Sequence, residues 1–254
     1  MAKGGVGMIL EKVWQWLTDA ASWSGPNGIP VRLEEHLIYS FVTVLIAAAI
    51  GIPLGTWIAH SGRGRWLVTA ANAARAVPSL GLLFVASMWA GSRFSSDLGA
   101  YIAPSIVVLV ILAIPPILAG AYAGVSEVDP AARDAAKGMG MTGGQVFGRV
   151  ELPNALPLIF SGLRSATLQV IATATIAASV SLGGLGRYLI DGLAQSRYDI
   201  MVGGSVLVAL LALVIDLLFG LVQRFVVSPG LTGRTVRRSV RSQTKAIEAT
   251  GSVR

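Results

Sequence analysis

Long uncharged apolar runs constrain this chain more than any other feature of its sequence. Residues 37–59 and 98–125 contain no Asp, Glu, Lys, Arg or His. A helix of about 20 such residues crosses the ~30 Å hydrocarbon core of a bilayer. Only 13% of the 254 residues are charged, against about 25% in soluble domains. The sequence therefore predicts an all-α, polytopic membrane protein.

About five transmembrane helices are expected, and the second and third contain residues that are expected to interrupt or bend them. Arg75 and Pro78 interrupt the second span, and Pro115-Pro116 bends the third. The spans are predicted at 36–59, 66–90, 98–125, 156–182 and 201–222.

These spans divide the chain into three parts. Residues 1–35 are predicted to be an interfacial or external segment, and residues 36–228 the transmembrane domain, with a polar loop at 126–153. Residues 229–254 are predicted to be a basic, disordered cytoplasmic tail.

The N-terminal segment contains one amphipathic stretch. A helix from Met8 to Trp23 places Leu10, Val13, Trp14 and Leu17 on one face. Its three tryptophans favour a helix that lies in the membrane interface. The alternative is a helix whose apolar face packs on the rest of the protein.

The basic residues divide unevenly between the two sides of the membrane. The loop at 61–65, the loop at 126–153 and the chain from Arg224 onward together hold twelve Lys and Arg, against six on the other side. Cytoplasmic loops carry this excess in membrane proteins. We therefore expect the polar loop and the C-terminus in the cytoplasm and the N-terminus outside. The basic tail is expected beside anionic lipid, with no nucleic acid as a partner.

The polar loop has the sequence signals of two short helices. Asp129 is a good N-cap, and Pro130 occupies the first helical position, where its missing N–H costs nothing. Gly138 is expected to end this helix in the left-handed conformation. Thr142 opens the second helix, with Gln145 completing a capping-box pattern. The sequence predicts a compact helical pair that projects from the membrane and ends at Pro153.

Residues for catalysis or for cofactor binding are missing from the sequence. The chain has no cysteine, no G-x-x-x-x-G-K-[ST] phosphate loop and two histidines, His36 and His60, at opposite ends of the first span. Both histidines are expected to be interfacial, and they lie too far apart to share a metal ion. We expect no enzyme activity, no metal site and no cofactor.

Three charged residues lie within predicted spans: Arg75, Arg164 and Asp216. An unpaired charge at the centre of a membrane helix costs about 2.5–3.5 kcal/mol on insertion scales. We therefore expect Asp216 to pair with Arg164 or with Arg75. The pair is either static or a latch that differs between inward-open and outward-open forms.

The fourth span is rich in small and hydroxyl-bearing residues. Such a surface either packs closely against a neighbouring helix or lines a polar pathway. The candidates for a transport pathway are Thr167, Thr173, Thr175 and Ser179.

The polar loop resembles the EAA loop of binding-protein-dependent ABC importer permeases. The similarity rests on Asp134-Ala135-Ala136, Gly140 and Val150-x-Leu152-Pro153, with Asp134 and Val150 standing where the family usually has Glu and Ile. The resemblance implies a type I importer-like fold whose cytoplasmic coupling loop docks on a subunit that binds ATP. The residues that it assigns to this contact are Asp134, Ala135, Ala136, Lys137, Gly138, Gly140, Leu152 and Pro153.

Further segments look like the glycine betaine/carnitine/choline (osmoprotectant) branch of these permeases. They are Ala76 to Leu80, Val128 to Pro130, Ala135 to Thr142, Arg149 to Pro153 and Gly183 to Gly186. This branch implies a plasma (inner) membrane location. It also implies an external solute-binding protein and a second permease copy or sister permease as partners. The nearest alternative is the same machinery importing another solute, such as methionine, a sulfonate or a phosphonate. A transporter that uses an ion gradient instead of ATP is the alternative from another class.

Overall fold

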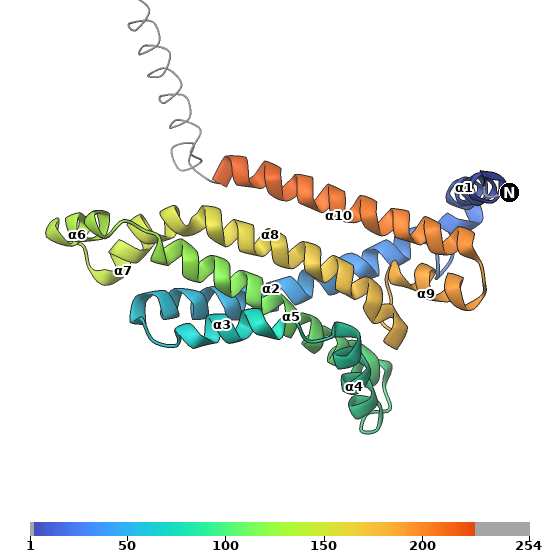
Figure 1. The fold of residues 1–254 in the computed structure, drawn as a ribbon, viewed down its shortest axis with the longest axis horizontal. Coiled ribbons are helices and arrows are strands. Elements are labelled where there is room, and N and C mark those ends of the chain that lie inside the picture. The colour runs from blue at the N-terminus through green and yellow to red at the C-terminus, as the bar shows by residue number, and fades with distance from the viewer. Residues whose placement is uncertain (1–2, 227–254) are drawn as a thin grey trace, which may run out of the picture.

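The computed structural model describes residues 3–226, which form helices joined by short turns and include no strand in that range. Within these described residues, four helices are long and apolar enough to cross a membrane. They run side by side along the long axis of the molecule (Figure 1). The all-α, polytopic prediction is confirmed. The first is α2 (Ile29–Ser61) and the last is α10 (Tyr198–Val226). Between them lie two further helical runs, Leu98–Ser126 and Gly143–Val180. The run Leu98–Ser126 comprises η2 (Leu98–Ile102) and α5 (Ala103–Ser126).

The predicted second span is not one helix. Residues 66–90 divide into α3 (Arg65–Ala74) and α4 (Ser79–Gly91), whose axes differ by 89°. Pro78 explains the break, because proline has no N–H to donate and disfavours helical geometry at the residue before it. The α3–α4 pair makes a fifth, broken span if both parts lie in the membrane. Figure 1 shows α4 leaving the bundle, and Met88 on this arm is 74% exposed.

Small residues allow the helices around α5 to approach one another closely. A Cβ added to Gly55 of α2 would lie 2.6 Å from the carbonyl oxygen of Leu118 in α5. On the other side of α5, a Cβ at Gly162 would lie 2.6 Å from the carbonyl oxygen of Pro116. Backbones that come this close gain dispersion contacts without a hydrophobic driving force. α5 is therefore the central helix, packed between α2 and α8 (Leu152–Ala177).

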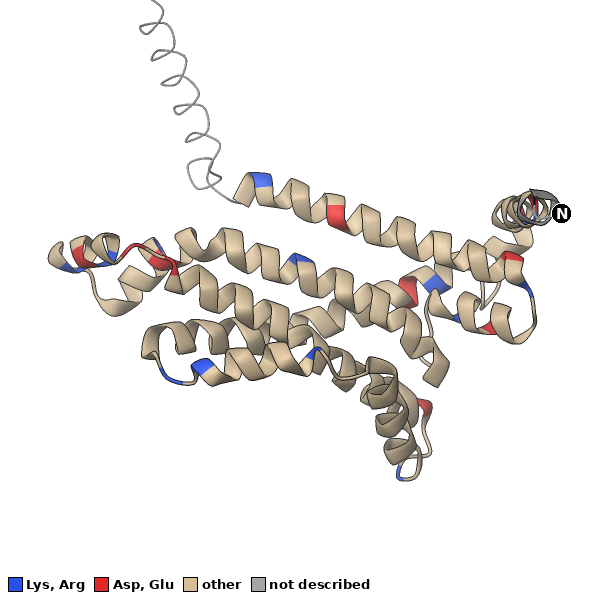
Figure 2. Cartoon of the chain, in the orientation of Figure 1, with Lys and Arg blue, Asp and Glu red and all other residues tan. Residues whose placement is uncertain are grey.

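The connecting segments gather at two ends of the bundle. The C-terminal ends of α2, α5 and α10 lie at the end where α6 (Pro130–Gly138) projects (Figure 1). α1 (Lys3–Thr18) and α9 (Gly186–Ala194) lie at the opposite end. Charged residues are also concentrated near these ends (Figure 2).

One expected division falls within a helix, and another falls outside the described residues. α2 begins at Ile29, after Gly28 as its N-cap, so the division expected between residues 35 and 36 lies inside a helix. Pro30 fits there because the first turn of a helix does not use its N–H groups. The predicted tail at 229–254 lies outside the described residues.

Candidate functional site: the projecting helix and its base

α6 begins as its sequence predicts. The Asp129 carboxylate accepts a hydrogen bond of 2.9 Å from the N–H of Ala131, and Pro130 follows as the first helical residue. The cap satisfies a backbone donor that has no partner inside the helix. α6 extends beyond the end of the membrane-spanning bundle (Figure 1).

The end of α6 differs from the prediction. Gly138 is the last helical residue, and Gly140 adopts the left-handed conformation with φ +81°. The N–H of Met141 donates to Ala136 O at 3.2 Å, and the N–H of Gly140 to Lys137 O at 2.9 Å. These two bonds make a Schellman motif, in which the left-handed residue follows the C-cap. The prediction placed this residue two positions too early.

The second helix of the polar loop continues without a break into the next long apolar helix. The N–H of Thr142 donates to Gln145 Oε1 at 2.9 Å, and α7 (Gly143–Val146) starts there. A π-helical turn, η3 (Phe147–Glu151), then joins α7 to α8. Leu152 and Pro153 therefore form the first turn of α8.

The surface of α6 is largely open to solvent. Ala136 is the exception, with 1% of its surface exposed, so it packs against the base of the loop. Met139 at the tip is 72% exposed. The predicted coupling residues Asp134, Ala135, Lys137, Gly138, Gly140 and Pro153 are also exposed, and Leu152 is half-buried.

Glu151 joins three helices at the base of the loop. Its side chain is 5% exposed, and its carboxylate lies 2.8 Å from Nε of Arg133 in α6. Nε2 of His60, at the C-terminal end of α2, contacts the other carboxylate oxygen. Arg133 also donates to the carbonyl of Val125 in α5. An acidic residue beside a predicted span is usually solvated, so nothing in the sequence distinguished Glu151.

The expected intramembrane ion pair is present between Arg164 and Asp216. Nε and Nη2 of Arg164 in α8 each donate a hydrogen bond of 2.6 Å to the carboxylate of Asp216 in α10. Arg75 does not take part: its guanidinium donates to Gln169 Oε1 at 3.2 Å. Of the two partners predicted for Asp216, the structure selects Arg164.

The predicted pathway threonines bond to their own helix. The hydroxyls of Thr167 and Thr173 each donate at 2.8 Å, and that of Thr175 at 3.0 Å, to the carbonyl four residues earlier. Thr173 and Thr175 are each 8% exposed, which agrees with close packing. Ser179 contributes a buried hydroxyl. The small residues of α8 that remain exposed are Ser161, Ser165 and Ala172.

At the opposite end, the glycine-rich turn closes over the start of α2. The N–H of Gly184 (φ +86°) donates to the Glu35 carboxylate at 2.8 Å. His36 beside it is 1% exposed, and its Nε2 lies 3.2 Å from Ile171 O. The expectation that His36 is interfacial is wrong, because this turn and α8 cover the imidazole.

Residues 51–228 match a protein family described as the binding-protein-dependent transport system inner membrane component. The chain belongs to this family. The permease is 34% identical over 203 residues to the glycine betaine/carnitine/choline transport system permease protein OpuCB of Bacillus subtilis (strain 168), covering 80% of the permease and 90% of that relative. It is 32% identical over 201 residues to the osmoprotectant import permease protein OsmW of Salmonella typhimurium, covering 78% and 91% of the two chains.

Solved structures agree with the fold of the permease. An inward-facing structure of the MetNI methionine ABC transporter superposes with a TM-score of 0.64 at 20% identity, covering 90% of the permease and all of that chain. At this identity the likeness concerns the fold alone. The expected family and the type I importer architecture are confirmed.

Proposed function

We propose that the permease imports quaternary-ammonium osmoprotectants, such as glycine betaine, choline or carnitine, with energy supplied by a separate ATP-binding subunit. Relatives named for these solutes share about a third of its residues over most of its length. The observation that carries the proposal is the exposed α6, a capped helix that projects from the end of the bundle.

The ATP-binding subunit docks on the exposed face of α6. Asp134, Lys137 and the Gly140 turn lie on this face, whereas Ala136 faces the base of the loop. Displacement of α6 reaches α5 through Arg133 and reaches α2 and α8 through Glu151. The permease itself is proposed to bind no ATP and to catalyse no reaction.

The end that carries α6 faces the cytoplasm in this proposal. The twelve Lys and Arg counted from the sequence on this side, seven of them from Arg224 onward, against six on the other side support that orientation. An external solute-binding protein delivers the solute to the opposite end, where the Gly184 turn and α9 lie. A second permease, identical or a sister chain, completes the pathway.

Reconstitution with purified partners tests the proposal. The permease is co-expressed with its ATP-binding subunit, reconstituted in liposomes and supplied with the solute-binding protein. We expect ATP hydrolysis to rise on addition of betaine, choline or carnitine, and labelled solute to accumulate only with ATP. Accumulation without ATP would favour a transporter driven by an ion gradient.

A competition experiment tests the solute class. Unlabelled betaine, choline and carnitine are expected to displace labelled substrate, and methionine, a sulfonate and a phosphonate to have no effect. Displacement by methionine, a sulfonate or a phosphonate would mean that the same kind of ATP-driven importer carries a different solute.

A further inference from the structure

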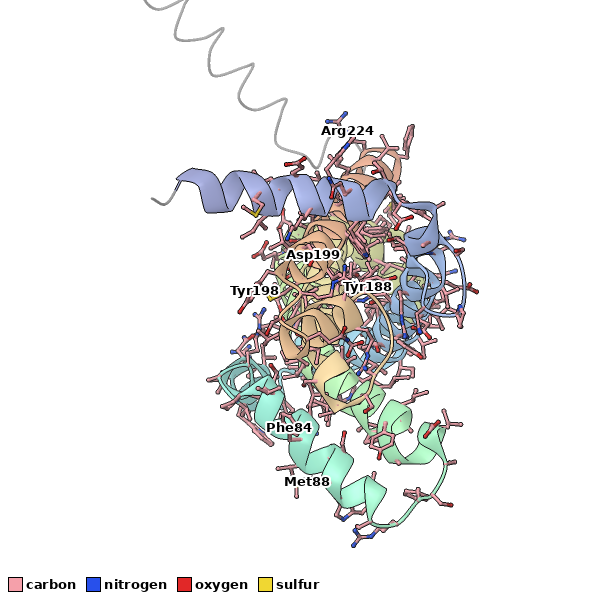
Figure 3. All side chains as sticks on the ribbon, turned by 90° about the vertical axis from the view of Figure 1, so that its right-hand side faces the viewer. Phe84, Met88, Tyr188, Tyr198, Asp199 and Arg224 are labelled. Atoms are coloured by element: carbon pink, nitrogen blue, oxygen red, sulfur yellow. The ribbon has the colours of Figure 1, made fainter. Side chains whose placement is uncertain are left out.

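The N-terminal helix α1 lies outside the segment that matches the family, so its role has to come from its own geometry. Seen from the end of the bundle that carries α9, α1 crosses the beginning of α10 and extends sideways beyond the other helices (Figure 3). Its axis is therefore roughly perpendicular to the membrane-spanning helices. A helix in this position would lie in the plane of a membrane crossed by the four long helices.

Contacts with α9 and α10 fix the depth of α1. A Cβ added to Gly203 of α10 would lie 2.5 Å from Cε3 of Trp16, so the indole ring rests directly on the backbone of that helix. Gly203 is five residues after Tyr198, where α10 begins, which corresponds to about 7.5 Å along the helix. The same indole ring meets Tyr188 of α9 edge-on at 5.1 Å. Amphipathic helices in the membrane interface bury their apolar face to about 5–10 Å.

Polar groups mark the water-facing boundary near this depth. Arg197 and Asp199 form an ion pair of 2.8 Å at the first turn of α10. Arg187 and Asp191 form another, also of 2.8 Å, on α9. α1 therefore lies between a charged rim and the apolar body of α10, which is the level of the lipid headgroups.

The apolar face of α1 is wider than its contact with the protein. Val13 is buried, whereas Leu10 and Trp14 on the same face are 59% and 69% exposed. Glu11, Lys12 and Gln15 occupy the remaining directions around the helix and are exposed. The helix extends beyond the bundle (Figure 3), so its exposed side chains face the surroundings of the protein.

We propose that α1 is an in-plane membrane anchor, with Leu10 and Trp14 inserted into the outer boundary of the bilayer and Trp16 docked on α10. Lipid is the occupant of this face for two reasons given above: the depth of the Trp16 contact and the sideways extension of the helix. Tryptophan is also the side chain that membrane interfaces favour.

The absence of cysteine from the chain makes a direct test possible. Single cysteines are introduced at Leu10, Glu11, Trp14 and Gln15 of the full-length protein and labelled with a nitroxide. The labelled proteins are placed in nanodiscs of phosphatidylethanolamine and phosphatidylglycerol. Power-saturation spectroscopy then compares collisions with oxygen, which concentrates in lipid, and with a water-soluble nickel chelate. We expect oxygen to dominate at positions 10 and 14 and nickel to dominate at positions 11 and 15.

Two results would overturn the proposal. Dominant nickel collisions at all four positions would place α1 in water, and exclusion of both reagents at positions 10 and 14 would mean that protein covers this face. Positions 10 and 11 give the same comparison between an apolar and a polar position, further from the Trp16 contact. They can therefore still decide the question if a label at position 14 disturbs folding. Neither outcome depends on which solute the permease carries.

Discussion

Arg164 and Asp216, 52 residues apart in the chain, meet through two parallel hydrogen bonds of 2.6 Å between α8 and α10. This fork geometry makes an arginine–carboxylate pair stronger and more directional than a single contact. Within residues 3–226, the pair links α10 to α8 by side-chain hydrogen bonds, and the packed surface of α10 beside it is apolar. We therefore expect loss of this pair to weaken the packing of α10 against α8.

The substitution Asp216→Asn tests this link. It leaves the Arg164 guanidinium without a charged partner inside a span, so we expect a lower thermal unfolding midpoint in detergent and reduced uptake. Asp199→Asn is the matched control, because Asp199 pairs with Arg197 at the end of the same helix; its effect should be smaller. The exchange Arg164→Asp with Asp216→Arg should recover part of the loss. Unchanged insertion and uptake in Asp216→Asn would exclude a latch.

Glu151→Gln should separate ATP hydrolysis from transport. The change removes the charge that faces Arg133 and His60 in a nearly closed site. Breaking a buried pair costs about 3–5 kcal/mol, and the partial exposure of Arg133 places our expectation at the lower end of that range. We expect ATP hydrolysis in the reconstituted complex to persist while solute accumulation per ATP falls. Glu127→Gln, at an exposed position near the same end of α5, should leave that ratio unchanged.

A double-mutant cycle shows whether Arg133 and Glu151 act together. If they do, Arg133→Gln combined with Glu151→Gln should be no worse than the poorer single variant, because each already removes the pair. Strictly additive losses in transport per ATP would mean that the two side chains act separately.

Gly140→Ala should weaken the projecting loop through its backbone alone. A Cβ at this position would meet no atom within 4 Å, whereas φ is +81°. An alanine in this conformation costs about 1–2 kcal/mol. Gly138→Ala is the control, because this glycine ends a regular helix in equally open space. Gly140→Asn should be milder than Gly140→Ala, since asparagine tolerates positive φ. The measurement is uptake by inserted protein, and equal activity of all three variants would contradict the argument.

Gly140→Asp gives a different comparison at the same position. Aspartate also tolerates the left-handed conformation, so a loss of transport there with Gly140→Asn active would come from the added charge on the face proposed to meet the ATP-binding subunit. We expect an inserted protein that no longer transports.

Gly55→Ala should force α2 and α5 apart. The new methyl group would lie 2.6 Å from Leu118 O and 2.9 Å from the Ala121 side chain. Overpacking of this kind costs about 1–3 kcal/mol, so the unfolding midpoint in detergent should fall. Gly220→Ala in α10 meets no atom within 4 Å and should not lower it. A midpoint for Gly55→Ala that equals that of Gly220→Ala would show that the two helices separate without cost.

Local sequence signals predicted four of the five spans and the start of α6, because each depends on a few neighbouring residues. The Asp129 cap and the uncharged run at 98–125 are examples. The position of the left-handed glycine was missed by two residues. Gly138 and Gly140 are the same residue type, and the sequence does not show where the Schellman hydrogen bonds form. The pairing of Asp216 with Arg164 was predicted only as one of two choices. The assignment of spans indicates how deep a residue lies in the membrane, but it does not show which helix faces contact one another.

Local sequence signals could not predict the contacts of the site that join residues far apart in the chain. The contact between His60 and Glu151 joins residues 91 apart, and it depends on how α2 and α8 pack. The enclosure of His36 likewise depends on the Gly184 turn folding back over α2. The right-angle break at Pro78 was expected as an interruption, but its size is set by how α3 packs on α5.

The unbroken helical run from Gly143 to Val180 has a mechanical consequence. Its 38 residues correspond to about 57 Å at 1.5 Å per residue, nearly twice the ~30 Å hydrocarbon core. Because the π-helical turn keeps α7 and α8 in one run, a rigid tilt about a point within the bilayer would move its two ends in opposite directions. A tilt of about 5° about the midpoint would displace each end by about 2.5 Å. Movement of the end next to α6 would thus be accompanied by a comparable movement at the far end of α8.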